Sequence, residues 1–103
     1  MLIYHIVLPE RWNSFGENAA YTAESLVTEG FIHCSYPHQL DAVLKRYYSE
    51  ANEVIILEVD TDKLSSRLVE EPSTNNEIYP HIYGAINRDA ILRVIEKKIL
   101  AAD

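Results

Sequence analysis

Two short segments, GFIHCS at residues 30–35 and YPHIYG at residues 79–84, carry the most informative pattern in this chain. Each places one histidine, His33 or His81, inside an apolar and aromatic run that is typical of a β-strand and ends beside a small residue. Strand positions with such neighbours are usually at least half buried, and a buried imidazole is costly unless its ring is engaged. The pattern therefore predicts that the two histidines share a pocket.

Apolar runs predict the strands of a sheet at residues 2–8, 31–34, 54–59, 68–70 and 78–86. The first run contains a third histidine, His5. The third run is apolar throughout, which is typical of a central strand that is buried on both faces. The last run contains Pro80, which cannot donate a hydrogen bond to a neighbouring strand, so we expect an edge strand or a bent one.

Helical patterns lie between these runs. Residues 9–18 predict a short helix that Gly16 ends, and residues 23–26 predict one further turn. Ser35 as a cap and Pro37 in the first turn predict the start of a longer helix. Its apolar face has the spacing i, i+3, i+4, i+7 and i+8, in Leu40, Val43, Leu44, Tyr47 and Tyr48.

Two further segments complete the prediction. Residues 60–62 are suited to cap a short helix that runs through Leu64. Residues 90–100 fit a strand and a helix equally well, and periodicity leaves both open. Strands and helices alternate irregularly, which predicts an α+β protein with a mixed, split β-sheet and a few short helices. The length of 103 residues predicts a single domain over residues 1–103.

Composition excludes several classes of partner and location. The formal charge of −7 would repel a polyanion, so we expect no nucleic-acid partner. The apolar runs are much shorter than the roughly 20 residues that span a bilayer, so we expect no membrane association. The first residues lack the features of a signal peptide, and the single cysteine, Cys34, cannot form an internal disulfide. Both observations favour a cytoplasmic protein.

The histidines and the cysteine do not predict a metal site. Catalytic zinc needs three protein ligands, and His33 and Cys34 are adjacent in a strand, so their side chains point to opposite faces. The same alternation separates Cys34 from the base that a nucleophilic thiol would need, which favours a buried small residue. Two roles stay open for Ser35, a helix cap or a ligand-binding hydroxyl. Two roles also stay open for Glu71, a solvated surface charge or a carboxylate that takes part in the chemistry of the site.

With these segments in view, the chain resembles a small bacterial family, domain of unknown function 952. The resemblance covers nearly the whole chain and rests on residues 3–5, residues 30–35 with Gln39, and residues 54–60, 71–73 and 79–84. The last block is the most specific. The chain departs from the family pattern at Tyr79, where phenylalanine is usual, and at Cys34, where leucine or another apolar residue is common.

This resemblance implies a compact fold that is similar to the ADP-ribosyltransferases, with NAD as a substrate held in a cleft of the split sheet. The order of the blocks is also similar to that of tRNA 2′-phosphotransferases. By that analogy His5 binds a ribose hydroxyl, and His33 lies near the pyrophosphate or the second ribose. His81 and Tyr83 line the nicotinamide end, and Glu71 supplies a carboxylate to the oxocarbenium-like transition state.

Three hypotheses follow. The first is an enzyme acting at the ribose of NAD, with His33, His81 and Glu71 as catalytic residues and His5, Ser35 and Tyr83 as ligand-binding residues. The second is a non-catalytic module that binds a nucleotide-like small molecule, which the scattered arginines favour because phosphate binding usually needs well-placed guanidinium groups. The third is that His33 and His81 only tie strands together. The acidic charge argues against an RNA substrate.

Overall fold

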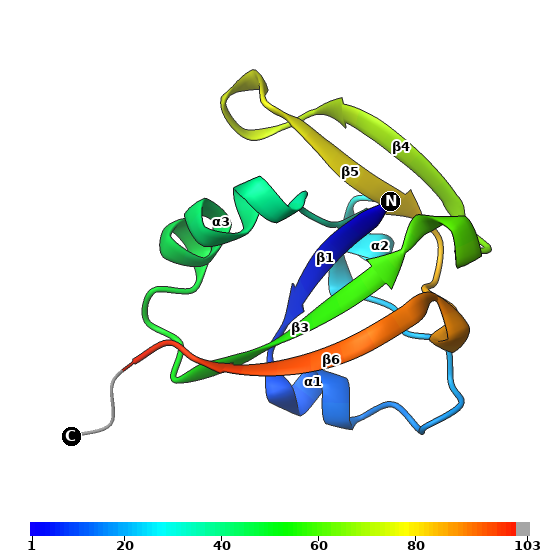
Figure 1. Cartoon of the computed structure of the whole chain (residues 1–103), viewed down its shortest axis with the longest axis horizontal. Coiled ribbons are helices and arrows are strands. Elements are labelled where there is room, and N and C mark those ends of the chain that lie inside the picture. The colour runs from blue at the N-terminus through cyan, green and yellow to red at the C-terminus, as the bar shows by residue number, and fades with distance from the viewer. Residues whose placement is uncertain (101–103) are drawn as a thin grey trace.

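A computed structural model describes residues 1–100 of the chain and shows two small sheets with short helices around them (Figure 1). The strands are β1 (Leu2–Val7), β2 (Ile32–His33), β3 (Glu53–Asp60), β4 (Arg67–Pro72), β5 (Ile78–Tyr83) and β6 (Ile91–Lys98). The α-helices are α1 (Pro9–Asn13), α2 (Glu24–Thr28) and α3 (Leu40–Tyr47). Single 3₁₀ turns are η1 (Pro37–Gln39), η2 (Thr61–Lys63), η3 (Thr74–Asn76) and η4 (Arg88–Ala90).

The strands form two three-stranded sheets, in the orders β1-β3-β6 and β2-β5-β4. The predicted α+β class, the split sheet and the short helices are confirmed. The predicted mixed pairing is wrong, because every pair of named strands within residues 1–100 is antiparallel. Parallel neighbours need a crossover of a dozen or more residues, whereas the turn between β4 and β5 is only residues 73–77.

Strand β3 lies at the centre of the first sheet and is buried on both faces, as its continuous apolar run predicts. One face contributes to the larger core cluster, with Ile55, Leu57 and Val59 beside Ile3 and Val7 of β1. The other face packs Val54 and Ile56 with Ile6 of β1 and Leu44 of α3. The predicted helix at α3 therefore covers one side of this sheet, and its apolar spacing explains why.

The segment after β2 joins the two sheets. The backbone N–H of Cys34 donates to the carbonyl of Pro80 in β5 at 3.1 Å. The next residue, Ser35, exchanges two backbone hydrogen bonds with Tyr4 of β1, each 2.8 Å long. One short stretch of chain thereby holds β1 against the second sheet. This linkage brings His5 of β1 close to His33 of β2.

Strand β5 lies at the centre of its sheet, so of the two alternatives predicted for this run, an edge strand or a bent one, the edge position is wrong. The carbonyl of Pro80 points towards the β2 side, and the nitrogen of the same residue points the same way. The missing N–H therefore faces the end of the two-residue strand β2, and the ladder with β4 loses no donor. A proline is tolerated in a central strand here because one neighbour is so short.

Two other local predictions need correction or completion. Ser35 is not the cap of the following helix, since its backbone is paired with β1; the turn starts instead after Tyr36, whose N–H donates to the side chain of Gln39 at 3.0 Å. Residues 91–98, where periodicity was indecisive, form the strand β6 against β3. The last three residues of the predicted domain lie outside the described part of the chain. No helix within residues 1–100 has the length and apolar character needed to cross a membrane.

Candidate functional site

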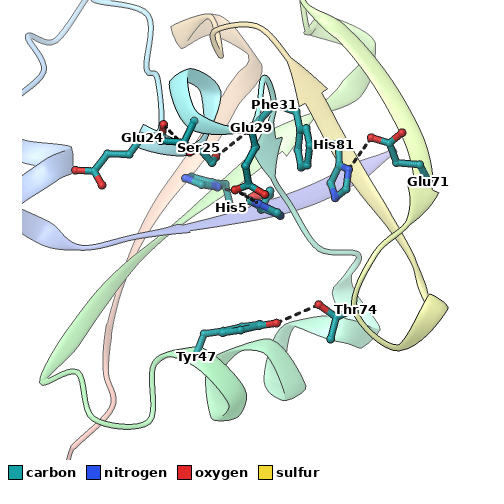
Figure 2. A network of polar contacts seen from close by, with 11 residues as sticks. His5, Glu24, Ser25, Glu29, Phe31, Tyr47, Glu71, Thr74 and His81 are labelled. Atoms are coloured by element: carbon teal, nitrogen blue, oxygen red, sulfur yellow. Dashed lines mark hydrogen bonds and ion pairs between the residues drawn. The ribbon is translucent and has the colours of Figure 1, made fainter.

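A cleft of about 560 Å³ opens between β1, α2, the β2 segment and α3. This volume is typical of sites that bind small molecules. Figure 2 shows Tyr47 of α3 and Thr74 of η3 lying opposite His5 and Ser25. The polar side chains along its walls are mostly hydroxyls and imidazoles: Tyr4, His5, Tyr21, Ser25, His33, Ser35, Tyr47, Tyr48, Ser73, Thr74 and Tyr79. Such groups can bind the hydroxyls and ring nitrogens of a neutral organic ligand.

His5 lies at the inner wall of this cleft with both ring nitrogens engaged. Its Nδ1 is 2.6 Å from the carbonyl of His33, which can only accept, so Nδ1 carries the proton. Its Nε2 is 2.9 Å from the hydroxyl of Tyr21, which donates to it. Burial lowers the pKa of His5 to about 4, so the ring is neutral at pH 7. A ribose hydroxyl that binds His5, as the resemblance implies, would have to replace Tyr21.

His33 reaches the cleft from β2 and is half exposed. Its Nε2 lies 2.9 Å from the carboxylate of Glu29, four residues earlier in the turn after α2. Its ring packs edge-on against two other rings, those of Phe31 at 4.9 Å and His81 at 5.3 Å between centroids. His33 is therefore oriented by a carboxylate on one side and by aromatic contacts on the other.

His81 is the partner of His33 in the β2–β5 register, and it is buried. Its Nδ1 donates to Glu71 of β4 at 2.8 Å, and the hydroxyl of Tyr83 donates to the same carboxylate oxygen (Figure 2 shows the Glu71 contact). The hydrogen bond from Tyr83, followed by that from His81, lowers the pKa of Glu71. The same bond raises the pKa of Tyr83. The three predicted residues thus form one connected network.

One atom of this network, Nε2 of His81, lacks a hydrogen-bond partner within residues 1–100. The ring of Phe31 stacks on that of His81, with centroids 4.1 Å apart and an angle of 18° between the planes. The Nε2 of His81 is buried. Buried polar atoms are nearly always satisfied, and exceptions concentrate at sites with a functional role. Because Nδ1 carries the proton donated to Glu71, a neutral His81 presents a lone pair at Nε2.

The predicted site residues therefore fall into two groups. His5, His33 and Ser35 line the cleft. His81, Glu71 and Tyr83 do not line it, and they connect to it through the contact between the rings of His81 and His33. Ser35 is buried at the cleft wall, which leaves the role of a ligand-binding hydroxyl open to it.

The surroundings of Cys34 and the placement of the metal-binding side chain types bear on thiol and metal chemistry. Cys34 is buried while its neighbour His33 is half exposed, as strand alternation requires. Burial raises the pKa of the Cys34 thiol, which disfavours the reactive thiolate. Within residues 1–100 there is no cluster of three or more His, Cys, Asp or Glu side chains able to hold a metal ion.

The sequence did not single out several residues that the fold brings to the cleft. Tyr47 was assigned to the apolar face of its helix, yet it is 59% exposed and donates to or accepts from Thr74 at 3.0 Å. Glu29 lies four residues before His33, but only the turn between α2 and β2 brings its carboxylate to 2.9 Å from the His33 ring. Arg11 and Thr74 carry no local signal, because only the tertiary fold places them there.

Comparisons with known proteins support the resemblance to domain of unknown function 952. A family described as protein of unknown function (DUF952) matches residues 6–94. The chain belongs to the DUF952 family. No curated protein matches this chain.

Solved structures of CC0527 from Caulobacter crescentus share the fold of this DUF952 protein. A crystal structure superposes with a TM-score of 0.80 at 23% identity, covering 93% of this chain and 85% of that one. A crystal structure of a double mutant gives a TM-score of 0.80 at 22% identity with the same coverage. A solution structure gives 0.71 at 24% identity, covering 91% of this chain and 82% of that one. At these identities the likeness shows the fold alone.

Proposed function

We propose that the cleft binds a nucleotide-like small molecule, with NAD as the first candidate, and that the protein acts on the ribose as a compact ADP-ribosyltransferase-like enzyme. The observation that carries the proposal is the 560 Å³ cleft, whose wall holds His33 with the carboxylate-bound His81 directly behind it. The arrangement of two small antiparallel sheets around this cleft supports it. NAD fits the walls because its ribose hydroxyls and carboxamide can bond to the tyrosine, serine and threonine hydroxyls.

The proposed reaction breaks the bond between C1′ of the ribose and the nicotinamide nitrogen. The bonding electrons move to the pyridinium nitrogen and release neutral nicotinamide. The acceptor then bonds to C1′ of the oxocarbenium-like centre and loses a proton to a base. His33 touches the ligand in this scheme because it lines the cleft, whereas Glu71 positions His81 by accepting a hydrogen bond from its Nδ1.

Binding is tested first, by thermal unfolding with NAD, ADP-ribose and nicotinamide. A ligand at ten times its Kd stabilises the fold by about 1.4 kcal/mol, which raises the Tm of a domain this size by about 5–10 °C. We expect this shift for the wild type and its loss in His33→Ala. The control is His38→Ala, which changes an exposed histidine outside the cleft lining. If none of the three ligands raises the Tm of the wild type, the NAD proposal is refuted.

Turnover is tested second, by following nicotinamide release from NAD over hours. We expect release by the wild type and a loss of at least tenfold in Glu71→Gln, which keeps the side-chain shape but removes the charge that orients His81.

A non-catalytic binding module is the second candidate, and one observation favours it. Of the cleft-lining residues within residues 1–100, Arg11 is the one arginine. Its guanidinium is already engaged, because Nε and Nη2 donate to the carbonyl of Thr22 and Nη1 lies 3.9 Å from the carboxylate of Glu24. A cleft with so little free positive charge is better suited to holding a ligand than to stabilising a phosphate-bearing transition state. Binding of NAD without any nicotinamide release would identify this module.

A further inference from the structure

A phosphate-bearing ligand needs a cation that is not already neutralised. Arg11 at the cleft wall is paired with Glu24 and with a backbone carbonyl. Arg93 is paired with Glu58, and Arg88 donates to two backbone carbonyls while its guanidinium lies 4.2 Å from the ring centre of Trp12. These three arginines have structural partners within residues 1–100. Arg67 of β4 is paired with Tyr83 in the ladder and is close enough to Glu71 to help lower the pKa of that carboxylate.

Arg46 differs from them. It is exposed in the last turn of α3, and no ion pair recorded within residues 1–100 includes it. Its guanidinium lies 5.8 Å from the ring centre of Tyr47, and its Nη1 makes a long hydrogen bond of 3.5 Å to the hydroxyl of Tyr79. Both tyrosines line the cleft. An uncompensated guanidinium is therefore held at the rim by two residues of the cleft wall.

Hydroxyl donors lie at the same rim. The hydroxyl of Tyr47 is 3.0 Å from that of Thr74, which links α3 to η3 on one side of the cleft, and Ser73 lines the cleft beside them. A phosphate group accepts hydrogen bonds from hydroxyls as well as from a guanidinium, and the two together fix its position.

We propose that Arg46 binds the phosphate groups of the ligand, with Tyr47 and Thr74 as supporting donors at the α3–η3 rim. The proposal rests on the function proposed above and gives the ligand a direction in the cleft. The phosphates lie at the rim formed by α3 and η3, and the ribose to be attacked points towards His33. The weak contact between Arg46 and Tyr79 is exchanged for a charge-assisted contact with phosphate.

The test compares Arg46→Gln with Lys45→Gln, which removes the same charge from the neighbouring residue of the same helical turn. Binding is measured by calorimetry or NMR for two kinds of probe: NAD, ADP-ribose and inorganic pyrophosphate, which carry phosphate, and nicotinamide riboside, which does not. We expect Arg46→Gln to weaken the phosphate-bearing probes about tenfold and to leave nicotinamide riboside unchanged. Lys45→Gln should bind every probe within about twofold of the wild type.

Two results would overturn the assignment. One is equal binding of the phosphate-bearing probes by the wild type and Arg46→Gln. The other is a wild type that binds none of them. The two failures are distinguishable. If NAD binds the wild type and Arg46→Gln equally, the role of Arg46 is refuted and the nucleotide site stands; if neither NAD nor nicotinamide riboside binds the wild type, the proposed function is refuted as well.

Discussion

The neutral state of His5 is one of the conditions on which the fold depends. Its ring donates to the carbonyl of His33 and accepts from Tyr21, and a proton on Nε2 would reverse the second bond and place a positive charge in a buried site. Because the Nδ1 bond is to the backbone carbonyl of His33, it also helps to fix the position of this cleft-lining histidine. In the nucleotide-binding proposal His5 therefore acts as a positioning residue for His33.

This arrangement predicts a stability that depends on pH. The pKa of His5 falls from 6.5 to about 4 on folding, so the unfolded chain binds more protons between these values and stability decreases as pH falls from 6.5 to 4. At pH 5 the loss relative to pH 7 is about 2 kcal/mol. Urea unfolding of the wild type and His5→Gln measures it. The slope should flatten in His5→Gln and stay in His38→Gln; an unchanged slope in His5→Gln would refute the assignment to His5.

The hydrogen bond from Tyr83 should control the pKa of Glu71. Its hydrogen bond is the largest cause of the lowered pKa of that carboxylate, so Tyr83→Phe should move the pKa of Glu71 up towards its ordinary value. Carboxyl ¹³C NMR follows the titration directly. The matched control is Tyr36→Phe, which removes the same kind of bond from the neighbouring Glu70 and should leave Glu71 unchanged. A Glu71 pKa that does not change in Tyr83→Phe would contradict the hydrogen bond between these two residues.

At the scale of elements, Gly84 just after the end of β5 allows a close approach to Ser66 just before the start of β4. A Cβ added at Gly84 would lie 2.4 Å from Oγ and 2.9 Å from Cβ of Ser66, where two chain segments meet. We expect Gly84→Ala to destabilise the fold by about 1–3 kcal/mol in urea unfolding. Adding Ser66→Gly should restore part of that loss. The control is Gly16→Ala, because apart from its chain neighbours no atom of residues 1–100 lies within 4 Å of a Cβ added there, and it should change stability by less than about 0.5 kcal/mol. Equal effects at the two glycines would contradict this reasoning.

The position of β3 predicts the pattern of amide hydrogen exchange. Its ladder is covered by β1 and β6 and its side chains are buried on both faces, so residues 54–59 should open only on global unfolding. The ends of the two-residue strand β2 should exchange much faster. Exchange measured by NMR at pH 7 checks both. Slower exchange in β6, an edge strand, than in β3 would contradict the topology.

Local pattern predicted most of these elements and failed where a partner strand decided the outcome. The apolar run at β3 and the spacing in α3 come from burial that each element imposes on its own sequence. Pro80 suggested an edge strand because local chemistry cannot reveal that its missing donor faces the end of a very short neighbour. Residues 91–98 were undecided for the same reason: β6 is a strand because β3 offers it a ladder.

At the scale of the whole molecule, the cleft is assembled from parts that are distant in sequence. His5, His33 and Ser35 could be identified because they lie in segments with a distinctive strand pattern, whereas Tyr47, Thr74 and Arg46 have ordinary neighbours. Their position depends on how α3 and η3 pack against the sheets. The connection of Glu71 and Tyr83 to His81 was likewise set by the β4–β5 register, which no single segment encodes.

The formation of a nucleotide complex is best followed by a ¹H–¹⁵N NMR titration of the ¹⁵N-labelled protein with NAD. We expect saturable shifts at micromolar to low millimolar ligand that cluster on the amides of His33, Ser35, Tyr47 and Thr74, all of which line the cleft. The same titration of His33→Ala should show no saturation, whereas Val27→Ala, a change at an exposed residue outside the cleft, should match the wild type. An absence of shifts in the wild type, or shifts scattered away from the cleft, would contradict the proposed nucleotide site.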